Sequence, residues 1–373
     1  MRLKVALVAA CTLAFGIVSA DAASARTTVI IDGGGWGHGI GMSQYGAYGR
    51  ALRGDSAKKI LQHYYSGSDV ATRDMSFIRV GLLQGRTEIT ASSAPMSAGG
   101  GLVVFKVQGT KGRIAKGGPD ATFRVVRSGT GGMRIYKNGN LVKKDGHRVF
   151  GSSSTPVVMK YEMHDSLVSI GGKSYRYAYG RMEFSTYSSS CGDVKVCLRL
   201  VLVLPMQKYV YGLGEVPSSW PDAALRTQAI AGRTYAYEKI LRNDQKLYPC
   251  ACAVYDSVID QAYIGDAKRT GSGAYWDDWK SAVDDTRGQV VVYHGDPIQA
   301  FYSSSSGGYT ENNENVWGGT AVPYLRGVPD GPDAVSANPN HTWRVTMGWR
   351  AFKSVVQSHY SVGDLQHVDF PKP

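Results

Sequence analysis

The feature that most constrains the fold is the stretch of residues 198–242, where an apolar run leads through a turn into a long Ala-rich segment. Residues 198–203 are apolar apart from one arginine, a composition typical of a buried strand. Residues 221–242 place small and apolar side chains at helical spacing, which predicts a long helix. Its core-facing residues are Leu225, Ala229, Gly232, Ala236 and Ile240. The glycine-containing junction between strand and helix carries one acid, Glu215.

Glu215 precedes the predicted helix, because Pro221 is tolerated only near a helix start. The hydroxyl and carboxylate groups of Ser218, Ser219 and Asp222 are expected to cap that helix. The positive helix end lowers the pKa of a nearby acid, whereas a general acid needs a raised pKa. For Glu215 to act as a general acid, burial by neighbouring aromatic residues would have to raise its pKa by more than the helix end lowers it. These residues are Tyr209, Tyr211 and Trp220. Without further information, a loop glutamate is more often a surface or capping residue than a catalyst.

The remaining sequence indicates an α+β fold that is predominantly β, with one long helix after the acid-bearing loop and a few shorter helices. Short β-type runs occur at residues 77–80, 122–126 and 133–136, separated by Gly, Ser and Asn turns. The dipeptide Asn138-Gly139 favours a hairpin. Shorter helices are predicted at residues 47–65 and 275–286.

The segment around Glu215 resembles the signature of the SpoIID/LytB family, which comprises stage II sporulation protein D and the amidase enhancer LytB. The matching residues are Leu204-Pro205, Tyr209-Val210, Gly212, Glu215-Val216-Pro217, Ala224-Leu225, Gln228-Ala229, Ala231 and Arg233-Thr234-Tyr235-Ala236. In this resemblance, Glu215 aligns with the family's catalytic glutamate.

Further blocks carry the same resemblance. They occupy residues 260–265, residues 279–290, residues 298–325 and the Gly-Trp-Gly-His block at residues 35–47. The last of these blocks usually ends the family's sequence but stands near the start of this one. This order indicates a circular permutation, or a truncated chain with a relocated block; a permutation is physically mild because domain termini often lie close together.

The predicted organisation has four parts. Residues 1–22 are a signal peptide, and residues 23–74 hold the Gly-rich block and a helix that belong to the core. Residues 75–195 form a β-rich accessory region, and residues 196–373 form the SpoIID/LytB core. The signal peptide is indicated by Arg2 and Lys4, an apolar run over residues 5–17 and small residues at 20–22. We therefore expect a secreted or cell-wall-associated protein with no membrane span after cleavage.

The resemblance implies a lytic transglycosylase that cleaves peptidoglycan glycan strands, with Glu215 as general acid and base. One carboxylate suffices when the C6 hydroxyl of muramic acid, rather than water, attacks the anomeric carbon. The resemblance also implies substrate-binding or acid-orienting roles for Gln228, Arg233, Tyr302, Ser304, Ser306, Gly307, Gly308, His38 and Gln44.

Blander interpretations stand beside these roles. The Gly-rich block could be a linker, although Trp36 and His38 are poor linker residues. A lone histidine such as His38 is more often a packed or surface imidazole than a catalyst. Trp317 and Tyr324 could stack on sugars, but large aromatic residues usually lie in the core.

A second interpretation is a noncatalytic wall-binding protein that stimulates a peptidoglycan amidase. Glu215 favours the enzyme. Ser303, which stands where the family usually has a histidine, favours the enhancer. The same holds for Ile259 and Asp260, which occupy the positions of the family's His-Cys pair.

The formal net charge of +12 suits an anionic cell wall, although solubility alone also explains it. The expected partners are peptidoglycan strands and a cell-wall amidase. No nucleic-acid motif is present in the sequence.

Cys191, Cys197, Cys250 and Cys252 remain after removal of the signal peptide. An even number of cysteines in an exported chain favours one or two disulfides, and four cysteines allow three pairings. A four-thiolate zinc site is conceivable but has unusual spacing. We therefore expect no cofactor and no metal.

Overall fold

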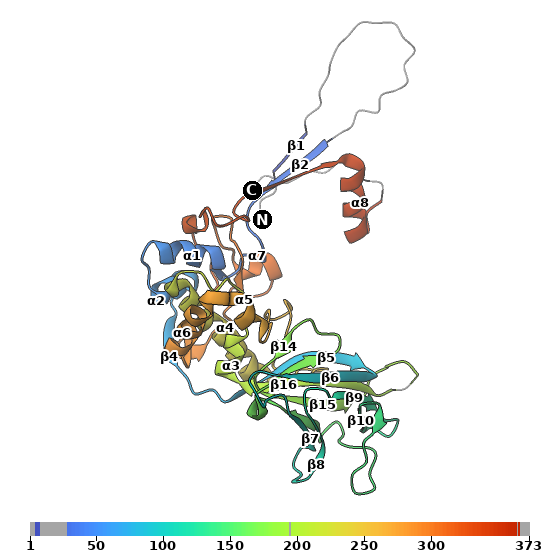
Figure 1. Cartoon of the computed structure of the whole chain (residues 1–373). Helices are drawn as coiled ribbons and strands as arrows, with labels where there is room; N and C mark the ends of the chain where they lie inside the picture. Colours follow the sequence, from blue (N-terminus) through green and yellow to red (C-terminus); the bar gives the residue numbers. More distant parts are fainter. Residues whose placement is uncertain (1–3, 8–27, 194, 364, 366–373) are drawn as a thin grey trace, which may run out of the picture. The chain divides into compact units, whose positions relative to one another are not determined.

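The computed structural model describes residues 4–7, 28–193, 195–363 and 365 (Figure 1). Most of the predicted signal peptide, including its cleavage site, lies outside these residues. The chain forms two compact units. The first unit comprises the described parts of Met1–Arg53 and Tyr302–Pro373 together with His63–Ser66, and the second comprises Gly54–Gln62 and Gly67–Phe301.

These units do not coincide with the boundaries expected from the sequence. Strand β16 (Cys197–Pro205) pairs with β5 (Phe77–Arg86) on one side and with β15 (Arg181–Tyr187) on the other. The region expected to be an accessory layer therefore shares a sheet with the acid-bearing segment. In the first unit, the Gly-rich block pairs with the start of the C-terminal segment, because β3 (Met42–Ser43) lies parallel to β20 (Tyr302–Ser303).

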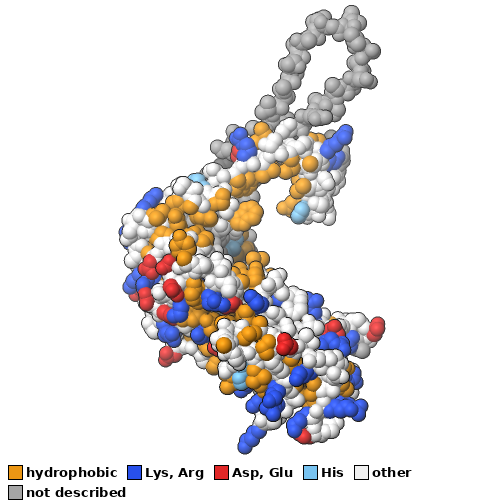
Figure 2. All heavy atoms as spheres, viewed as in Figure 1, with side chains coloured by type: hydrophobic (Ala, Val, Ile, Leu, Met, Phe, Trp, Pro, Cys, Tyr) orange, Lys and Arg blue, Asp and Glu red, His pale blue; other side chains and the backbone are white. Residues whose placement is uncertain are grey.

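The second unit contains two large sheets. The first sheet has the order β17-β5-β16-β15-β12-β7-β8, and the second has the order β11-β10-β9-β6-β13-β14. The further strands are β6 (Glu88–Pro95), β7 (Val103–Val107), β8 (Arg113–Gly117), β9 (Thr122–Arg127), β10 (Met133–Lys137), β11 (Asn140–Leu141), β12 (Val157–Lys160), β13 (Ser166–Ile170), β14 (Arg176–Tyr177) and β17 (Val254–Tyr255). On the face drawn in Figure 2, Lys and Arg side chains are dispersed over the surface.

A small sheet of β4 (Asp69–Thr72), β18 (Gln289–Tyr293) and β19 (Asp296–Pro297) completes the strands of the second unit. The Asn138-Gly139 hairpin is confirmed, because Lys137 pairs with Asn140 and both turn residues have positive φ. The predicted β runs at residues 77–80, 122–126, 133–136 and 198–203 all lie in strands. With 33% strand and 26% helix, the α+β, predominantly β class is confirmed.

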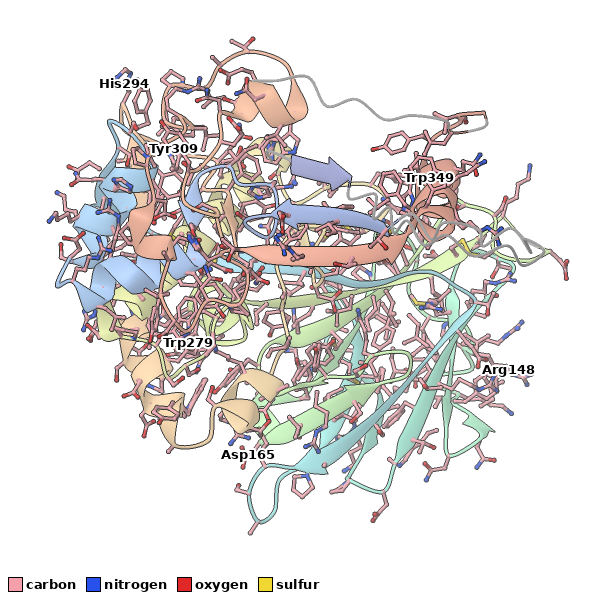
Figure 3. The ribbon with its side chains drawn as sticks, turned by 90° about the horizontal axis from the view of Figure 1, so that it is seen from above. Arg148, Asp165, Trp279, His294, Tyr309 and Trp349 are labelled. Carbon is pink, nitrogen blue, oxygen red and sulfur yellow. A yellow bond between two sulfur atoms is a disulfide. The ribbon has the colours of Figure 1, made fainter. Side chains whose placement is uncertain are left out.

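The long helix is α4 (Asp222–Asn243), and its predicted core residues Leu225, Ala229 and Ala236 are fully buried. The expectation of a side-chain cap is wrong: Pro221 occupies the cap position, and the Ser218 hydroxyl instead bonds to that of Ser272 at 2.6 Å. The shorter helix predicted at residues 275–286 is α6 (Trp276–Asp285), whose Trp279 lies among the helices of this unit (Figure 3).

The other helical elements of the second unit are α3 (Met206–Tyr211), α5 (Ala267–Ser272), η1 (Glu162–His164) and η2 (Gly273–Tyr275). The single helix predicted at residues 47–65 is wrong, because this segment forms α1 (Gln44–Leu52) and α2 (Ala57–Tyr64). Gly54 between them has a φ of +86°, which no right-handed helix accommodates.

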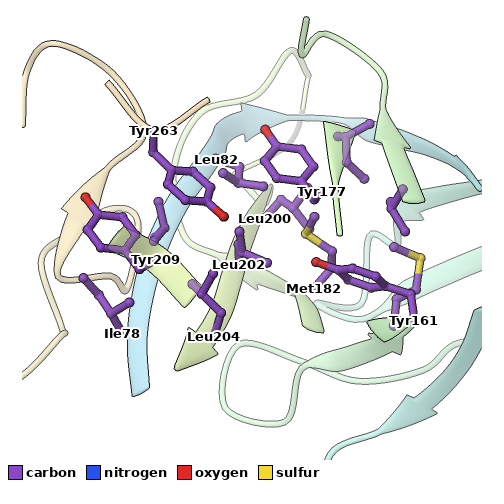
Figure 4. Close-up of a cluster of buried hydrophobic side chains, with 14 of the residues drawn as sticks. Ile78, Leu82, Tyr161, Tyr177, Met182, Leu200, Leu202, Leu204, Tyr209 and Tyr263 are labelled. Carbon is purple, nitrogen blue, oxygen red and sulfur yellow. The ribbon is translucent and has the colours of Figure 1, made fainter. Parts of the chain in front are cut away.

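Strand β16 is buried on both faces, which explains its nearly continuous apolar sequence. Leu200, Leu202 and Leu204 face the main core, together with Tyr209 and Tyr263 (Figure 4). Val201 and Val203 point to the opposite face.

The opposite face of β16 packs against a disulfide between Cys250 and Cys252. A second disulfide joins Cys191 and Cys197. The prediction of disulfides is therefore confirmed, with pairings that the sequence left open. None of the four cysteines is available as a thiolate ligand.

The first unit combines a small sheet with turns and short helices. Strand β2 (Thr28–Gly33) pairs with β1 (Lys4–Leu7) and β21 (Trp343–Gly348). The further elements are α7 (Asn313–Trp317), η3 (Gly331–Asp333) and α8 (Trp349–His359). Across the described residues of both units, no helix combines the length and apolar character needed to cross a membrane.

Candidate functional site

The loop that carries Glu215 is held by the segment around Tyr263. Leu213 and Tyr263 form an antiparallel bridge. Two backbone hydrogen bonds flank this bridge. The amide of Gly214 donates to the carbonyl of Ala262 at 2.8 Å, and the amide of Ile264 donates to the carbonyl of Gly212 at 2.9 Å. The segments around Leu213 and Tyr263, about 50 residues apart in the sequence, are thus joined by backbone hydrogen bonds like those of a short strand pair.

Gly212 and Gly214 are required because side chains of the opposite segment lie directly over them. A Cβ atom at Gly212 would lie 2.5 Å from the ring of Tyr263, and one at Gly214 would lie 2.6 Å from the side chain of Ile264. Neither glycine has a positive φ, so close approach and not backbone conformation accounts for them.

Substituting Gly214 with Ala is therefore expected to lower the unfolding free energy by about 1–3 kcal/mol, the usual cost of overpacking. Equilibrium denaturation by urea would measure this change. Gly271→Ala is the matched control: no atom lies within 4 Å of its Cβ position and it sits in helix α5, so that alanine should be neutral or slightly stabilising. Equal effects of both substitutions would contradict the close-packing argument.

Glu215 is half-buried and lines a pocket of about 400 Å³. Its Oε1 accepts a hydrogen bond from the amide of Ala262 at 2.6 Å, which fixes the carboxyl group. The pocket is lined by Gly214, Glu215, Val216, Pro217, Ser218, Ser219, Ile264, Ala267, Lys268, Gly271, Ser272 and Tyr275. Among these residues, Glu215 provides the one carboxylate.

Beneath the loop, a tyrosine stack joins the site to helix α4. The rings of Tyr209 and Tyr263 are stacked with their centroids 5.1 Å apart (Figure 4). The Tyr209 hydroxyl donates to Gln261 Oε1 at 2.9 Å, and Gln261 Nε2 donates to the carbonyl of Gly232 at 3.1 Å. Burial raises the pKa of Tyr209, and the charge of Glu215 adds to this effect. These contacts connect the segment around Tyr263 to α4, and burial keeps Tyr209 neutral.

Lys268 is a site residue that the sequence analysis missed. Its side chain comes from α5 and is 5% exposed, and its Nζ donates to the carbonyl of Val216 at 2.6 Å. The ammonium also lies 4.8 Å from the ring centre of Trp279. Burial lowers the pKa of Lys268 to about 8, although the charge of Glu215 opposes this shift. No motif marks this lysine in the sequence, because only the folding of α5 beside the loop gives it a role.

Two residues with predicted roles, Gln228 and Arg233, are 1% exposed and do not line the pocket. Arg233 donates through Nη1 to the carbonyl of Gln289 at 3.1 Å and through Nη2 to that of Val283 at 3.2 Å. Burial lowers the pKa of Arg233 to about 10. In this structure Arg233 is thus an internal anchor between α4 and the segment after α6, and its position does not favour substrate contact.

The other predicted site residues lie in the first unit. There, two buried aspartates organise the loop of Ser306, Gly307 and Gly308, called the Ser-Gly-Gly loop below. The Ser306 hydroxyl donates to Asp330 Oδ2 at 2.7 Å, and the amide of Gly307 donates to Asp333 Oδ2 at 3.1 Å. The amide of Gly308 in turn donates to Ser306 Oγ at 3.1 Å. The loop is therefore internally bonded, and the Ser306 hydroxyl, to which a sugar-binding role was assigned, supports the loop.

Asp330 and Asp333 were not recognised in the sequence. Asp333 accepts hydrogen bonds from the hydroxyls of Ser43 and Ser305, each at 2.8 Å, and lies 2.9 Å from His341 Nδ1. Asp330 accepts a bond from Tyr64, and burial raises the pKa of this carboxyl group. Both aspartates stand in an ordinary Asp-Gly-Pro-Asp turn, which carries no sign of this role in the sequence.

His38 is held as a neutral imidazole. Its Nδ1 accepts a bond from the amide of Ile40 at 3.0 Å, and the ring bonds to the backbone of Tyr302. Its ring lies 5.1 Å from that of Trp317, and burial lowers the pKa of His38. These contacts match the blander interpretation of a packed imidazole.

The remaining predicted residues of this unit lie around the same loop. Gln44 is buried at the start of α1, and Tyr302 lies half-buried in β20. Ser304 Oγ accepts a bond from Asn340 at 3.4 Å. Among the described residues, no group of three or more metal-ligating side chains is placed to hold an ion.

Comparison with known proteins connects the Glu215 loop to one family. The profile of the stage II sporulation protein (SpoIID) family matches residues 196–293, which include β16, α3, the loop and α4.

Three relatives extend this match. An uncharacterized protein of Brachyspira hyodysenteriae is 37% identical over 40% of this chain and 37% of its own length. Stage II sporulation protein D of Bacillus subtilis is 34% identical over 34% of this chain and 38% of its own. The amidase enhancer of Bacillus subtilis is 35% identical over 36% of this chain and 16% of its own.

The matches thus span well under half the length of each relative. The family model covers the segment that places Glu215 between a buried strand and a long helix. Residues 196–293 of this chain are therefore a segment similar to the SpoIID family.

Proposed function

We propose that the chain is an exported, peptidoglycan-acting lytic transglycosylase that cleaves the bond between N-acetylmuramic acid and N-acetylglucosamine. The observation that carries this proposal is a single carboxyl group. Glu215 is fixed by the Ala262 amide in the lining of a pocket, and the described lining contains no second carboxylate. Hydrolysing glycosidases need two carboxyl groups, about 5–5.5 Å apart for retention or about 6.5–9.5 Å apart for inversion.

One carboxyl group is enough if the substrate supplies its own nucleophile. Protonated Glu215 gives its proton to the glycosidic oxygen, and the bond from the muramic anomeric carbon to that oxygen breaks. The C6 hydroxyl of the same muramic residue then bonds to the anomeric carbon and loses its proton to the Glu215 carboxylate. The products are a 1,6-anhydro end and a free N-acetylglucosamine hydroxyl, no water is consumed, and Glu215 returns protonated.

A noncatalytic role as a wall-binding amidase enhancer is the second candidate. The observation that favours it is the similarity to a protein named amidase enhancer. The partners proposed for both functions are peptidoglycan strands, with a cell-wall amidase added for the second. The formal net charge of +12 supports attraction to an anionic wall outside the cytoplasmic membrane, and the similarity to stage II sporulation protein D makes sporulation one setting to test.

Product analysis separates the two functions. Purified peptidoglycan, intact or stripped of stem peptides, is incubated with the protein in water enriched in oxygen-18, and the ends are identified by mass spectrometry. We expect new anhydro-muramyl ends without the heavy isotope. Reducing ends that carry it would instead identify a hydrolase. Binding without new ends on either substrate would overturn the lytic proposal and favour the enhancer.

A further inference from the structure

Lys268 occupies an energetically costly position that the mechanism above does not use. Lysine is almost never fully buried unless it is paired, because burial disfavours its charged form. Here the ammonium keeps three favourable partners: the carbonyl of Val216, the face of Trp279 and the charge of Glu215. Two of these three partners belong to the turn that carries the candidate acid.

Lys268 is the cation of the pocket lining, and its charge interacts with that of Glu215. Helix α3 contributes Tyr209, a neutral hydroxyl, and the pocket wall contributes Tyr275. Arg269 of α5 pairs at 2.8 Å with Asp266, the residue before this helix, and neither residue lines the pocket. Helix α6 packs the uncharged ring of Trp279 against the lysine. Among the described residues that line the pocket, Lys268 is the only lysine or arginine.

We propose that Lys268 is a positioning residue for Glu215: its buried ammonium anchors the Glu215-Val216 turn and supplies the charge that governs when Glu215 releases its proton. A nearby cation favours the carboxylate over the carboxylic acid. In the proposed reaction, which this inference deepens, the ammonium therefore stabilises Glu215 after it has protonated the leaving oxygen. The same charge makes Glu215 lose its proton at a lower pH than it would without Lys268.

The first experiment titrates Glu215 by carbon-13 NMR in the full chain, with labelled glutamate, in the wild type and in Lys268→Met. Methionine keeps an unbranched apolar chain against Trp279 but removes the charge. We expect the titration of Glu215 to move upward by on the order of one pH unit. In Lys268→Arg, which keeps the positive charge, Glu215 should titrate close to its wild-type value. The control Lys280→Met removes an ammonium that bonds to Asp284 on α6, away from the pocket lining, and should not move Glu215.

A reciprocal measurement decides the matter if Lys268→Met does not fold. Coupling between two sites is mutual, so removing the charge of Glu215 must lower the pKa of Lys268 by a similar amount. In Glu215→Gln, whose side chain has nearly the same shape, the Lys268 ammonium should titrate below its wild-type value of about 8. An unchanged titration of Glu215 in Lys268→Met, or of Lys268 in Glu215→Gln, would overturn the proposal.

These titrations need no activity, so they test the inference even if the lytic proposal fails. If glycan cleavage is found, its rate against pH gives a further readout. Loss of the ammonium should move the alkaline limb upward, since Glu215 then keeps its proton to higher pH. A merely structural role for Lys268 would change the height of the profile and leave the limb in place.

Discussion

Replacing Glu215 with Gln is expected to lower the rate of glycan cleavage by about 10²- to 10⁴-fold, the usual contribution of a positioned proton donor. Glutamine keeps the shape of the side chain and an Oε1 atom that can still accept the 2.6 Å hydrogen bond from the Ala262 amide. It has no proton to give to the leaving oxygen and cannot take one from the C6 hydroxyl. Chemistry should therefore fail while the loop keeps its structure.

The rate of formation of anhydro-muramyl ends measures this effect, and thermal unfolding checks the fold. Glu238→Gln is the matched control, because Glu238 lies on α4, pairs with Arg242 and does not line the pocket. We expect its activity to stay near that of the wild type. A Glu215→Gln protein that folds and retains full activity would exclude Glu215 as the proton donor.

Replacing Asp333 with Ala is expected to lower the unfolding free energy by about 3–5 kcal/mol, because several buried hydrogen-bond donors lose their acceptor. The Asp333 carboxylate is fully buried and accepts bonds from two hydroxyls and two backbone amides of its surroundings. Alanine leaves these donors without an acceptor, and each unsatisfied buried donor costs about 1–3 kcal/mol. The Ser-Gly-Gly loop should lose its order first.

Urea unfolding monitored by tryptophan fluorescence and by amide hydrogen exchange of residues 303–308 would measure the effect. Asp333→Asn keeps one acceptor oxygen and should fall between the wild type and the alanine variant. Asp32→Ala in the same unit is the control, since Asp32 forms an exposed pair with Arg344 and its loss should have little effect. If Asp333→Ala were as stable as Asp32→Ala, the aspartate would not organise the loop.

Local patterns in the sequence were sufficient for several elements of the second unit. Strand β16, helices α4 and α6 and the Asn138-Gly139 hairpin follow from apolar periodicity and turn chemistry, which act between residues close in the chain. The disulfides followed from cysteine number and the expected compartment, but their pairing did not. Where local signals competed, the prediction failed: Ser218 could cap α4, yet its hydroxyl bonds to Ser272 from α5.

Side-chain roles were harder to predict, because they depend on burial and on distant partners. Arg233 stands beside the acid in the family motif, but the fold turns it inward to the carbonyls of Val283 and Gln289. Ser306 was expected to face a sugar, whereas it bonds to Asp330, a residue 24 positions away. None of these three partners could be identified from spacing, since hydrogen bonds between distant segments leave no local pattern.

The sequence by itself determined the resemblance to the SpoIID/LytB signature, the fold class and the position of Glu215 between a buried strand and a long helix, because apolar periodicity, turn residues and motif spacing are local properties. Only the tertiary structure decided what surrounds that acid. The amide of Ala262 and the ammonium of Lys268 come from a segment about 50 residues away. The amide bonds to Glu215 and the ammonium to the carbonyl of Val216, and Gly212 and Gly214 let that segment approach closely. Burial and charge interactions of this kind depend on distance in space, and only folding sets that distance.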